Sequence, residues 1–362
     1  MSMHRVLLLG AGKIGSAIAK FLASTGDFDV TVGDIDQGML DRLPAGLKAN
    51  KTRLDVSKHD QLVAAMKGVN SVISACSYVV NPGIARACLE AGASYFDLTE
   101  DVATTRAVRE LSSKAKPGQI FMPQCGLAPG FISIVAADLT KPFDTLDEVR
   151  MRVGALPIYP TNSLKYNLTW STDGLINEYC NPCEAIRDGA RTDLMPLEGL
   201  EHFSLDGLDY EAFNTSGGLG TLCETLDGKL RTLDYKTVRY PGHRELVKFL
   251  AEDLRLSHRR EIFKDILEHA VPMTLQDVVL VFVTVTGKIG GRLMQKTDSR
   301  KIYHADVLGE HWSAIQITTA SGMCTVVDMH REGKLPSQGF VKQEQVGLSA
   351  FLANRFGKYY AV

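Results

Sequence analysis

The sequence lacks any long apolar run. Of its 362 residues 45% are hydrophobic, yet no stretch of about 18–20 apolar residues occurs that would span a bilayer. The short apolar run before Gly10 leads into a glycine turn and has no small-residue cleavage site behind it. We therefore expect a cytoplasmic protein with no membrane partner.

The chain also lacks an excess of charge of either sign and an even set of cysteines. Its 40 Lys and Arg residues face 42 Asp and Glu, whereas a nucleic-acid partner would favour a basic surplus. Seven cysteines, scattered between Cys76 and Cys324, do not form a disulfide framework. Cys180 and Cys183 form a lone C-x-x-C pair, so we expect no metal site. Without repeats or low-complexity segments, this length suggests two globular domains.

A glycine-rich turn is the first feature that is present. Residues 10–15 read Gly-Ala-Gly-Lys-Ile-Gly and lie between the aliphatic run Val6–Leu9 and apolar residues at helical spacing. In this strand–turn–helix context Gly10 permits the tight turn, Gly12 lets the backbone approach a pyrophosphate, and Gly15 allows the helix to pack closely on the strand. The helix N-terminus offers N–H groups to the phosphates. The segment therefore predicts dinucleotide binding.

An acidic residue closes the next apolar run. Asp34 follows Val30–Val32, about 20 residues after the glycine turn, where a carboxylate accepts hydrogen bonds from the adenosine ribose. Its charge would repel a 2′-phosphate, and no Arg or Lys follows until Arg42. We expect NAD rather than NADP. The alternative is a structural turn followed by a surface acid.

Strand and helix patterns continue to alternate up to residue 123. Expected strands are Ser71–Ala75, Ser94–Leu98 and Gln119–Met122, and expected helices are His59–Lys67, Pro82–Ala91 and Thr104–Ala115. This alternation predicts a doubly wound α/β (Rossmann) domain, whose ligand lies outside the carboxyl ends of the strands. The predicted cofactor-binding residues are Gly10, Gly12, Lys13, Ile14, Gly15, Asp34, Ile35, Asp55, Val56, Ala75, Cys76 and Ser77.

The pattern changes after residue 123, where the loop Cys125–Phe131 contains two glycines and a proline. Period-two alternation over Glu148–Ala155 predicts a half-buried strand. Similar runs occur at Val278–Thr286, Lys301–Val307 and Ala314–Ile317, and helices are expected at Ile132–Leu139, Leu175–Tyr179, Arg244–Ala251, Gly322–Gly333 and Val346–Phe356. We predict an α+β second domain with a largely antiparallel sheet.

Several segments occur in the order seen in the saccharopine dehydrogenase family. They are the glycine fingerprint, Cys125–Phe131, Val153–Pro157, Tyr166–Ser171, Asn214–Gly218 and Arg239–His243. The segment from Tyr166 through Gly189 is most similar to the lysine 6-dehydrogenase branch. The resemblance implies NAD-dependent oxidative deamination of the L-lysine ε-amine to allysine, which cyclises to piperideine-6-carboxylate. It also implies a discontinuous first domain (1–123 with 318–362), a substrate domain (124–317) and a homodimer or higher homo-oligomer formed through the antiparallel sheet.

Candidate catalytic and substrate residues of the first part lie near the expected strand ends. Asp97 is the best placed acid for a general base or for holding the substrate ammonium, and Glu100 follows closely. The alternative is that this acidic cluster caps the next helix. Cys125 and Gly126 are candidate substrate contacts, although a buried cysteine is most often a small hydrophobe.

The second part supplies the remaining candidates. His243 is a candidate base, or it caps the following helix. Arg239 is a candidate clamp for the substrate carboxylate, or it pairs with an acid inside the domain. Tyr166 is a candidate for hydrogen bonding to the amine, although an aromatic on a strand usually belongs to the core. Thr215 and Ser216 lie in what reads as a mobile loop able to receive a carboxylate, or in a plain surface turn.

Two further interpretations of the function remain open at this stage. One is saccharopine dehydrogenase, whose substrate has three carboxylates and calls for several converging cations; the main candidates are Arg239, Arg244 and Lys165. The other is a non-catalytic NAD-binding sensor.

Overall fold

The computed structural model describes residues 3–362, so Met1 and Ser2 of the predicted first domain lie outside the described residues. Two compact units are present. The first runs up to Phe131 and includes Gln316–Ala361, and the second is Ile132–Ile315. The sequence predicted the boundaries between the two domains after residue 123 and after residue 317. Among residues 3–362, no helix has the length and apolarity needed to cross a bilayer.

The first unit is built on a seven-stranded sheet in which every neighbouring pair is parallel. The strand order is β17-β6-β5-β4-β1-β2-β3. The strands are β1 (His4–Leu9), β2 (Phe28–Asp34), β3 (Asn50–Arg53), β4 (Ser71–Ser74), β5 (Ser94–Asp97), β6 (Ile120–Met122) and β17 (Gly339–Phe340). The helices before residue 131 are α1 (Lys13–Ala23), α2 (Gln37–Asp41), α3 (His59–Ala65), α4 (Asn81–Ala91) and α5 (Val102–Ser112). The predicted doubly wound fold is confirmed.

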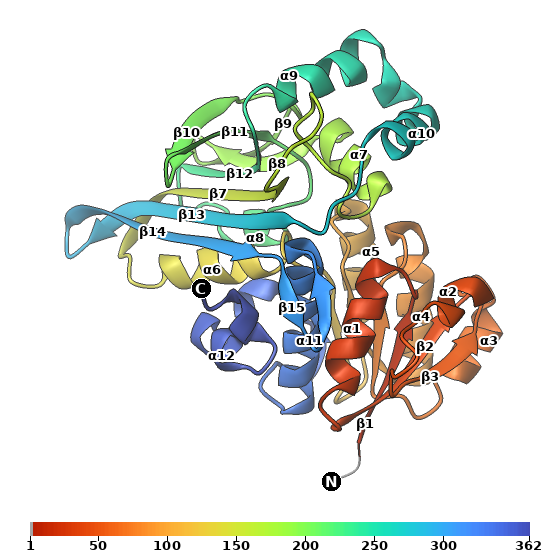
Figure 1. Cartoon of the computed structure of the whole chain (residues 1–362). Coiled ribbons are helices and arrows are strands. Elements are labelled where there is room, and N and C mark those ends of the chain that lie inside the picture. The colour runs from red at the N-terminus through yellow and green to blue at the C-terminus, as the bar shows by residue number, and fades with distance from the viewer. Residues whose placement is uncertain (1–2) are drawn as a thin grey trace. The chain divides into compact units, whose positions relative to one another are not determined.

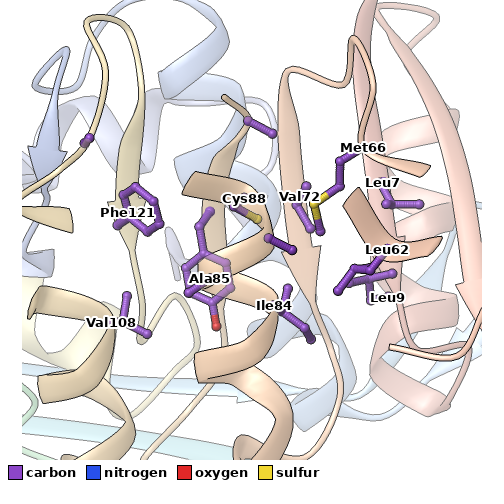
Figure 2. Packing of buried hydrophobic residues seen from close by; sticks show 14 of the residues in the cluster. Leu7, Leu9, Leu62, Met66, Val72, Ile84, Ala85, Cys88, Val108 and Phe121 are labelled. Carbon is purple, nitrogen blue, oxygen red and sulfur yellow. The ribbon is translucent and has the colours of Figure 1, made fainter. Parts of the chain in front are cut away.

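One face of this sheet packs against α3, α4 and α5. Leu62, Ile84 and Val108 from these helices join a buried cluster with strand residues that include Leu9 and Phe121 (Figure 2). Alternate residues of each strand point to opposite faces, so a strand covered on both sides is apolar throughout. This explains why the aliphatic run of β1 could be recognised from the sequence.

The opposite face of the same sheet is covered by α1 and by the C-terminal part of the chain. The Phe21 ring of α1 meets Tyr359 edge-on at 5.3 Å between ring centroids, and Phe131 stacks on Tyr360 at 3.8 Å. Arg355 pairs with Asp328, and the Asp328 carboxylate is buried. The segment that follows the second unit in sequence is therefore part of the core of the first.

The second unit contains a mixed eight-stranded sheet. Its main path runs β10-β11-β12-β7-β13-β14, with β8 paired to β12 and β9 paired to β8 (Figure 1). The strands are β7 (Thr145–Pro157), β8 (Cys183–Arg187), β9 (Ala190–Leu194), β10 (Glu201–Leu205), β11 (Leu208–Asn214), β12 (Thr232–Arg239), β13 (Asp277–Ile289) and β14 (Arg292–Tyr303). Only β7 and β12 pair in parallel among these described strands. The predicted α+β architecture is confirmed.

The helices and a small hairpin complete the chain. The helices are α6 (Phe131–Thr140), α7 (Thr172–Cys180), α8 (Leu222–Thr225), α9 (His243–Lys248), α10 (Arg260–Ala270), α11 (Ala314–Arg331) and α12 (Leu348–Ala353), and the hairpin is β15 (Ala305–Val307) with β16 (Glu310–Trp312). The strand predicted over Ala314–Ile317 is wrong, because these residues form the first turn of α11. The Asp277 carboxylate accepts hydrogen bonds from the backbone N–H groups of Ala314 and Ile315, which caps that turn.

The cap at Asp277 makes stability depend on pH. Burial raises the pKa of this carboxyl to about 6, above its value in the unfolded chain. The folded state then holds the proton more tightly than the unfolded chain does. The stabilisation that comes from protonated Asp277 is therefore fully present below about pH 4 and is lost as pH rises to about 6. Between those values, the free energy of unfolding of the wild type relative to Asp277→Asn should fall by up to about 3 kcal/mol. Urea unfolding of both proteins across the range tests this, and a constant difference would contradict it.

Candidate functional site

The glycine turn joins β1 to α1, and each glycine has a distinct geometric role. A Cβ on Gly15 would lie 2.0 Å from the Gly10 carbonyl oxygen, so only glycine lets the helix start this close to the strand. Gly10 has φ +99° and lies against the backbone of Ala75 at the end of β4. Gly12 begins the helix, and a Cβ there would meet no described atom within 4 Å. The open side of Gly12, next to the N–H groups of a helix N-terminus, fits a pyrophosphate.

Asp34, at the end of β2, contacts the glycine turn. Its Oδ2 accepts a hydrogen bond from the Ala11 N–H at 2.7 Å, and its Oδ1 accepts one from the Asp36 N–H at 2.9 Å. A carboxylate has about four lone-pair positions, so two hydrogen bonds leave capacity for ribose hydroxyls. The residue thus both supports the turn and is placed to bind the ribose.

Sequence reasoning missed a cation beside this acid. β3 lies next to β2 in the sheet, and Arg53 is the register neighbour of Asp34. The Arg53 side chain is exposed, and its Nε donates to the Ile35 carbonyl oxygen at 3.1 Å. Arg42 is the first basic residue after Asp34 in the sequence, whereas Arg53 becomes a neighbour of Asp34 only through the adjacent strand.

Asp34 and Arg53 have opposite expected effects on cofactor choice. Replacing Asp34 by Ala removes the charge that repels a 2′-phosphate, so we expect the KM for NAD to rise and the preference for NAD over NADP to fall about tenfold. Arg53→Ala should instead reduce any use of NADP and leave the KM for NAD within about twofold, because a guanidinium favours the phosphate. Steady-state kinetics with both cofactors measure the ratio, and an unchanged ratio in Asp34→Ala would defeat the ribose assignment.

The other predicted cofactor residues at strand ends have these positions. Asp55 is partly exposed and accepts hydrogen bonds from the N–H and hydroxyl of Ser57, which lower its pKa. Ala75 and Cys76 are partly buried, Ser77 is exposed, and burial raises the pKa of the Cys76 thiol to about 11. That thiol is therefore protonated at neutral pH.

Asp97 is the centre of a buried hydrogen-bond network at the end of β5. Its Oδ2 accepts from the Tyr95 hydroxyl at 2.6 Å and the Asn81 amide at 3.3 Å, and its Oδ1 accepts from the backbone N–H of Thr99 and Gln124. Burial raises the pKa of this carboxyl. With four donors, Asp97 ties three chain segments together. Its catalytic role remains a prediction. Asp101, the last acid of the same cluster, caps helix α5 through the Thr104 N–H, as the alternative interpretation predicted.

The loop that contains Cys125 and Gly126 is buried. The Cys125 thiol points to the Met122 carbonyl oxygen at 3.0 Å and accepts from the Gln343 amide at 3.3 Å, and burial raises its pKa well above the ordinary value. Gly126 faces Gly130, where a Cβ would collide with the Gly126 oxygen. Glu100 is partly buried just before the α5 cap. For Cys125 and Gly126 the geometry gives a packing role, and substrate contact by these three residues remains a prediction.

In the second unit, the central feature is the buried guanidinium of Arg239, at the end of β12. Three cationic side chains are buried in the described chain: Arg152, Lys236 and Arg239. Arg152 pairs with Asp234 and Glu201, and Lys236 pairs with Glu201. Arg239, only 3% exposed, has no carboxylate within ion-pair distance among residues 3–362. It is surrounded by aromatic rings, with its guanidinium carbon 4.7 Å from the Tyr166 ring centroid.

A chain of hydrogen bonds fixes this guanidinium. Arg239 Nε donates to the Tyr179 hydroxyl at 3.1 Å, which lies 2.9 Å from His243 Nε2, and His243 Nδ1 lies 2.7 Å from the Leu164 carbonyl oxygen. A carbonyl only accepts, so Nδ1 carries the proton and Nε2 accepts from Tyr179. Burial and the nearby Arg239 charge lower the pKa of His243 to about 3. His243 therefore positions Tyr179 and Arg239 as a neutral ring, which argues against the predicted base.

The remaining predicted residues of the second unit are buried and bonded. Tyr166, expected on a strand, lies in an irregular segment, and its hydroxyl accepts from Trp170 at 3.1 Å. Thr215 and Ser216 do not form a mobile surface loop; their hydroxyls bond to Thr237 and to the Pro182 carbonyl.

Two residues of this unit were missed from the sequence. Tyr179 holds Arg239 through the hydrogen bond described above. Glu211 accepts from the Gly242 and Arg244 N–H groups and so caps α9, which removes the need for His243 as its cap. Both contacts join residues far apart in sequence, and no local signal marks them.

No group of three or more metal-ligating residues occurs in residues 3–362. Cys180 ends α7, Cys183 begins β8, and both are free thiols. Burial raises the pKa of both. Neither a zinc ligand set nor a low-pKa redox pair is present at this position.

The glycine turn, the acid after β2 and the parallel sheet define an NAD(P)-binding protein of the Rossmann class. Residues 6–122 match the saccharopine dehydrogenase NADP binding domain, and residues 126–356 match the saccharopine dehydrogenase C-terminal domain. The chain belongs to the saccharopine dehydrogenase family, as its sequence motifs predicted.

Known relatives are consistent with this assignment. The mitochondrial alpha-aminoadipic semialdehyde synthases of Mus musculus and Bos taurus are 23% and 25% identical over 300 residues. The match covers 78% of this chain and 31% of each relative, so the chain spans about a third of their length. Apo saccharopine dehydrogenase (L-Glu forming) from Saccharomyces cerevisiae has the same fold, with a TM-score of 0.77, 16% identity and coverage of 99% and 96% of the two chains. Homospermidine synthase from Legionella pneumophila, solved with NAD, also has this fold. Its TM-score is 0.68 and its identity 16%, and the match covers 99% of this chain and 89% of that one.

Proposed function

We propose that this chain is an NAD-dependent amine oxidoreductase acting on a lysine-related amino acid. One observation carries the substrate class: a buried guanidinium, held by Tyr179, that forms no ion pair among the described residues, since the buried Glu178 acts on it only from beyond ion-pair distance. A buried charge is costly unless it is paired. The carboxylate of an amino acid supplies the missing partner and can bind a guanidinium through two hydrogen bonds.

The number of unpaired cations favours L-lysine over saccharopine. Arg244 pairs with Glu198 and Glu245, and Lys165 donates to the Pro241 carbonyl oxygen. Of the three cations considered for a tricarboxylate, only Arg239 is both buried and without an ion pair. One such cation suits a substrate with one carboxylate. The proposed reaction is oxidation of the lysine ε-amine.

The chemistry places limited demands on the protein. Bound NAD accepts the hydride from the carbon that bears the amine. The ε-ammonium must first lose a proton to solvent, and water then adds to the resulting imine, so lysine, NAD⁺ and water give the semialdehyde, NADH, ammonium and one proton. Arg239 would fix the far end of the substrate and thereby orient the reacting carbon. The glycine turn, with Asp34, would hold the pyrophosphate and ribose.

The direct test is NADH formation with L-lysine or with L-saccharopine, each repeated with NADP. Reduction with lysine, with a product that aminobenzaldehyde traps, supports the proposal. Reduction of the cofactor with saccharopine alone supports the alternative, saccharopine dehydrogenase activity. No reduction with either, together with NAD binding by calorimetry, favours the non-catalytic sensor.

A further inference from the structure

Two histidines and an aspartate lie on one face of the hairpin β15–β16 in the second unit. Leu308 and Gly309 connect its strands and have φ of +51° and +78°, as in the two-residue turn that matches the twist of a hairpin. This turn places Asp306 directly opposite His311. Side chains alternate along a strand, so His304, two residues before Asp306, lies on the same face. The register of the hairpin, and not a sequence motif, thus brings these side chains together.

The two imidazole rings meet through one nitrogen each. His304 Nδ1 lies 2.9 Å from His311 Nε2. The other nitrogen of His311, Nδ1, lies 2.8 Å from an Asp306 carboxylate oxygen, which only accepts, so Nδ1 carries the proton. In the neutral ring Nε2 then presents its lone pair to His304. A carboxylate that orients an imidazole in this way is the usual support of a metal-binding histidine.

We propose that His304 Nδ1 and His311 Nε2 together bind one divalent transition-metal ion of the copper or nickel type. A metal ion lies about 2.0–2.1 Å from an imidazole nitrogen, so two nitrogens 2.9 Å apart subtend about 90° at the ion. Neighbouring ligands of a square-planar or octahedral ion have this angle, whereas a tetrahedral ion would need the nitrogens about 3.3 Å apart. The observed distance therefore favours Cu²⁺ or Ni²⁺ over Zn²⁺, with water in the remaining positions.

A change of tautomer converts the hydrogen-bonded pair into a chelate. The ion replaces the proton between the rings, and His304 carries its hydrogen on Nε2 instead of Nδ1. Both rings turn until their lone pairs converge on the ion. The site is open enough for this, because the side chains of His311 and Asp306 are 42% and 82% exposed. Asp306 keeps its hydrogen bond to His311 and supports the ligand from behind.

The charges around the hairpin also favour a cation. His311 lies close enough to the buried Asp277 for its charge to lower the pKa of that carboxyl. A dication held by the two rings is attracted by the same carboxylate and by Asp306. Because the two ligands meet only in the folded hairpin, binding should stabilise the folded chain.

The first experiment titrates the metal-free chain with Cu²⁺ by calorimetry at about pH 8, where imidazole is neutral. The sequence contains nine histidines, so the result lies in the difference between variants. His304→Gln and His311→Gln should each remove one equivalent of bound Cu²⁺ or weaken its binding at least about tenfold. Asp306→Asn should keep that equivalent and weaken it about tenfold. Unchanged binding in both histidine variants would overturn the proposal.

His269→Gln is the matched control for the two histidine variants. His269 is exposed and lies beside an acid, Asp265, but among residues 3–362 it forms no hydrogen bond or ring contact with another histidine. This variant should bind Cu²⁺ as the wild type does. If it loses as much bound Cu²⁺ as His311→Gln, copper binding does not depend on the paired rings and the proposal is wrong.

Trp312, next to His311 on β16, locates the ion independently. Trp170→Phe removes the other of the two tryptophans, so that all remaining tryptophan fluorescence comes from Trp312. One equivalent of Cu²⁺ should quench this fluorescence, because a bound Cu²⁺ ion quenches a tryptophan close to it. Adding His311→Gln should abolish the quenching. Quenching that persists would place the ion elsewhere and contradict the proposal.

Ni²⁺ and Zn²⁺ test the coordination geometry. Cu²⁺ binds tightly to most sites of this kind, so its affinity alone does not distinguish a 90° arrangement from a tetrahedral one. With the nitrogens 2.9 Å apart, Ni²⁺ should bind more tightly than Zn²⁺ in the same calorimetric titration. Tighter binding of Zn²⁺ would contradict the geometry assigned to the pair.

Discussion

Arg239→Ala is expected to lose at least about a hundredfold in kcat/KM for the amino-acid substrate. Truncating one partner of a buried, hydrogen-bonded charge pair costs about 2–5 kcal/mol, and about 2.7 kcal/mol is a hundredfold. Arg239 forms no ion pair among the described residues, and the buried Glu178 acts on it only from beyond ion-pair distance, so the substrate carboxylate is the main partner that the variant loses. The variant should therefore lose kcat/KM for the amino-acid substrate while its affinity for NAD stays unchanged. Steady-state kinetics with calorimetric NAD binding separate the two.

Arg244→Ala is the matched control for Arg239→Ala. It removes a nearby guanidinium whose partners are Glu198 and Glu245 within the same unit. We expect kcat/KM to stay within about threefold, because the Arg244 guanidinium already has acidic partners within the unit and is not available to a substrate carboxylate. If Arg244→Ala costs as much as Arg239→Ala, the site holds more than one carboxylate and the saccharopine alternative gains support.

Two glycine substitutions in the same turn are expected to have different effects on thermal stability and on NAD binding. Gly15→Ala places a Cβ 2.0 Å from a backbone oxygen, which no side-chain movement can relieve. We expect a loss of about 3 kcal/mol or more, or roughly 10 °C in Tm. Gly12→Ala meets no described atom within 4 Å and has a φ of −69° that alanine adopts freely. Its Tm should remain unchanged.

The cofactor distinguishes these two variants further. The new methyl of Gly12→Ala occupies the space where the pyrophosphate would approach the helix N-terminus, so we expect at least a tenfold weaker Kd for NAD. Thermal unfolding and NAD titration of both proteins are sufficient to measure this. A Gly12→Ala variant that binds NAD as tightly as the wild type would show that the phosphates lie elsewhere.

The nucleotide-binding unit could be predicted because its signals are local. A buried parallel strand, a glycine turn and a helix follow one another within residues 6–22, and Gly10 and Gly15 are required by contacts within that turn or with the adjoining strand end. Asp34 closes the next strand. Arg53 escaped prediction because strand order in the sheet, not distance along the sequence, makes it a neighbour of Asp34.

The second unit was less predictable for a different reason. Arg239, Tyr179 and His243 are brought together by side-chain hydrogen bonds. Burial and the Arg239 charge, neither of which shows in the sequence, lower the pKa of His243 and keep its ring neutral. A histidine after a Pro-Gly turn has the same sequence whether its ring titrates in water or is buried. The four donors around Asp97 are likewise invisible in the sequence.

The place of β17 at the edge of the first sheet has a consequence for biosynthesis. This strand pairs with β6, which is made far earlier by the ribosome. During translation of the entire second unit, the nascent first unit exposes the β6 edge and the apolar face that later receives Tyr359 and Phe356. The chain therefore completes its nucleotide-binding unit only late in synthesis, and until then its uncovered edge is a substrate for chaperones or for aggregation.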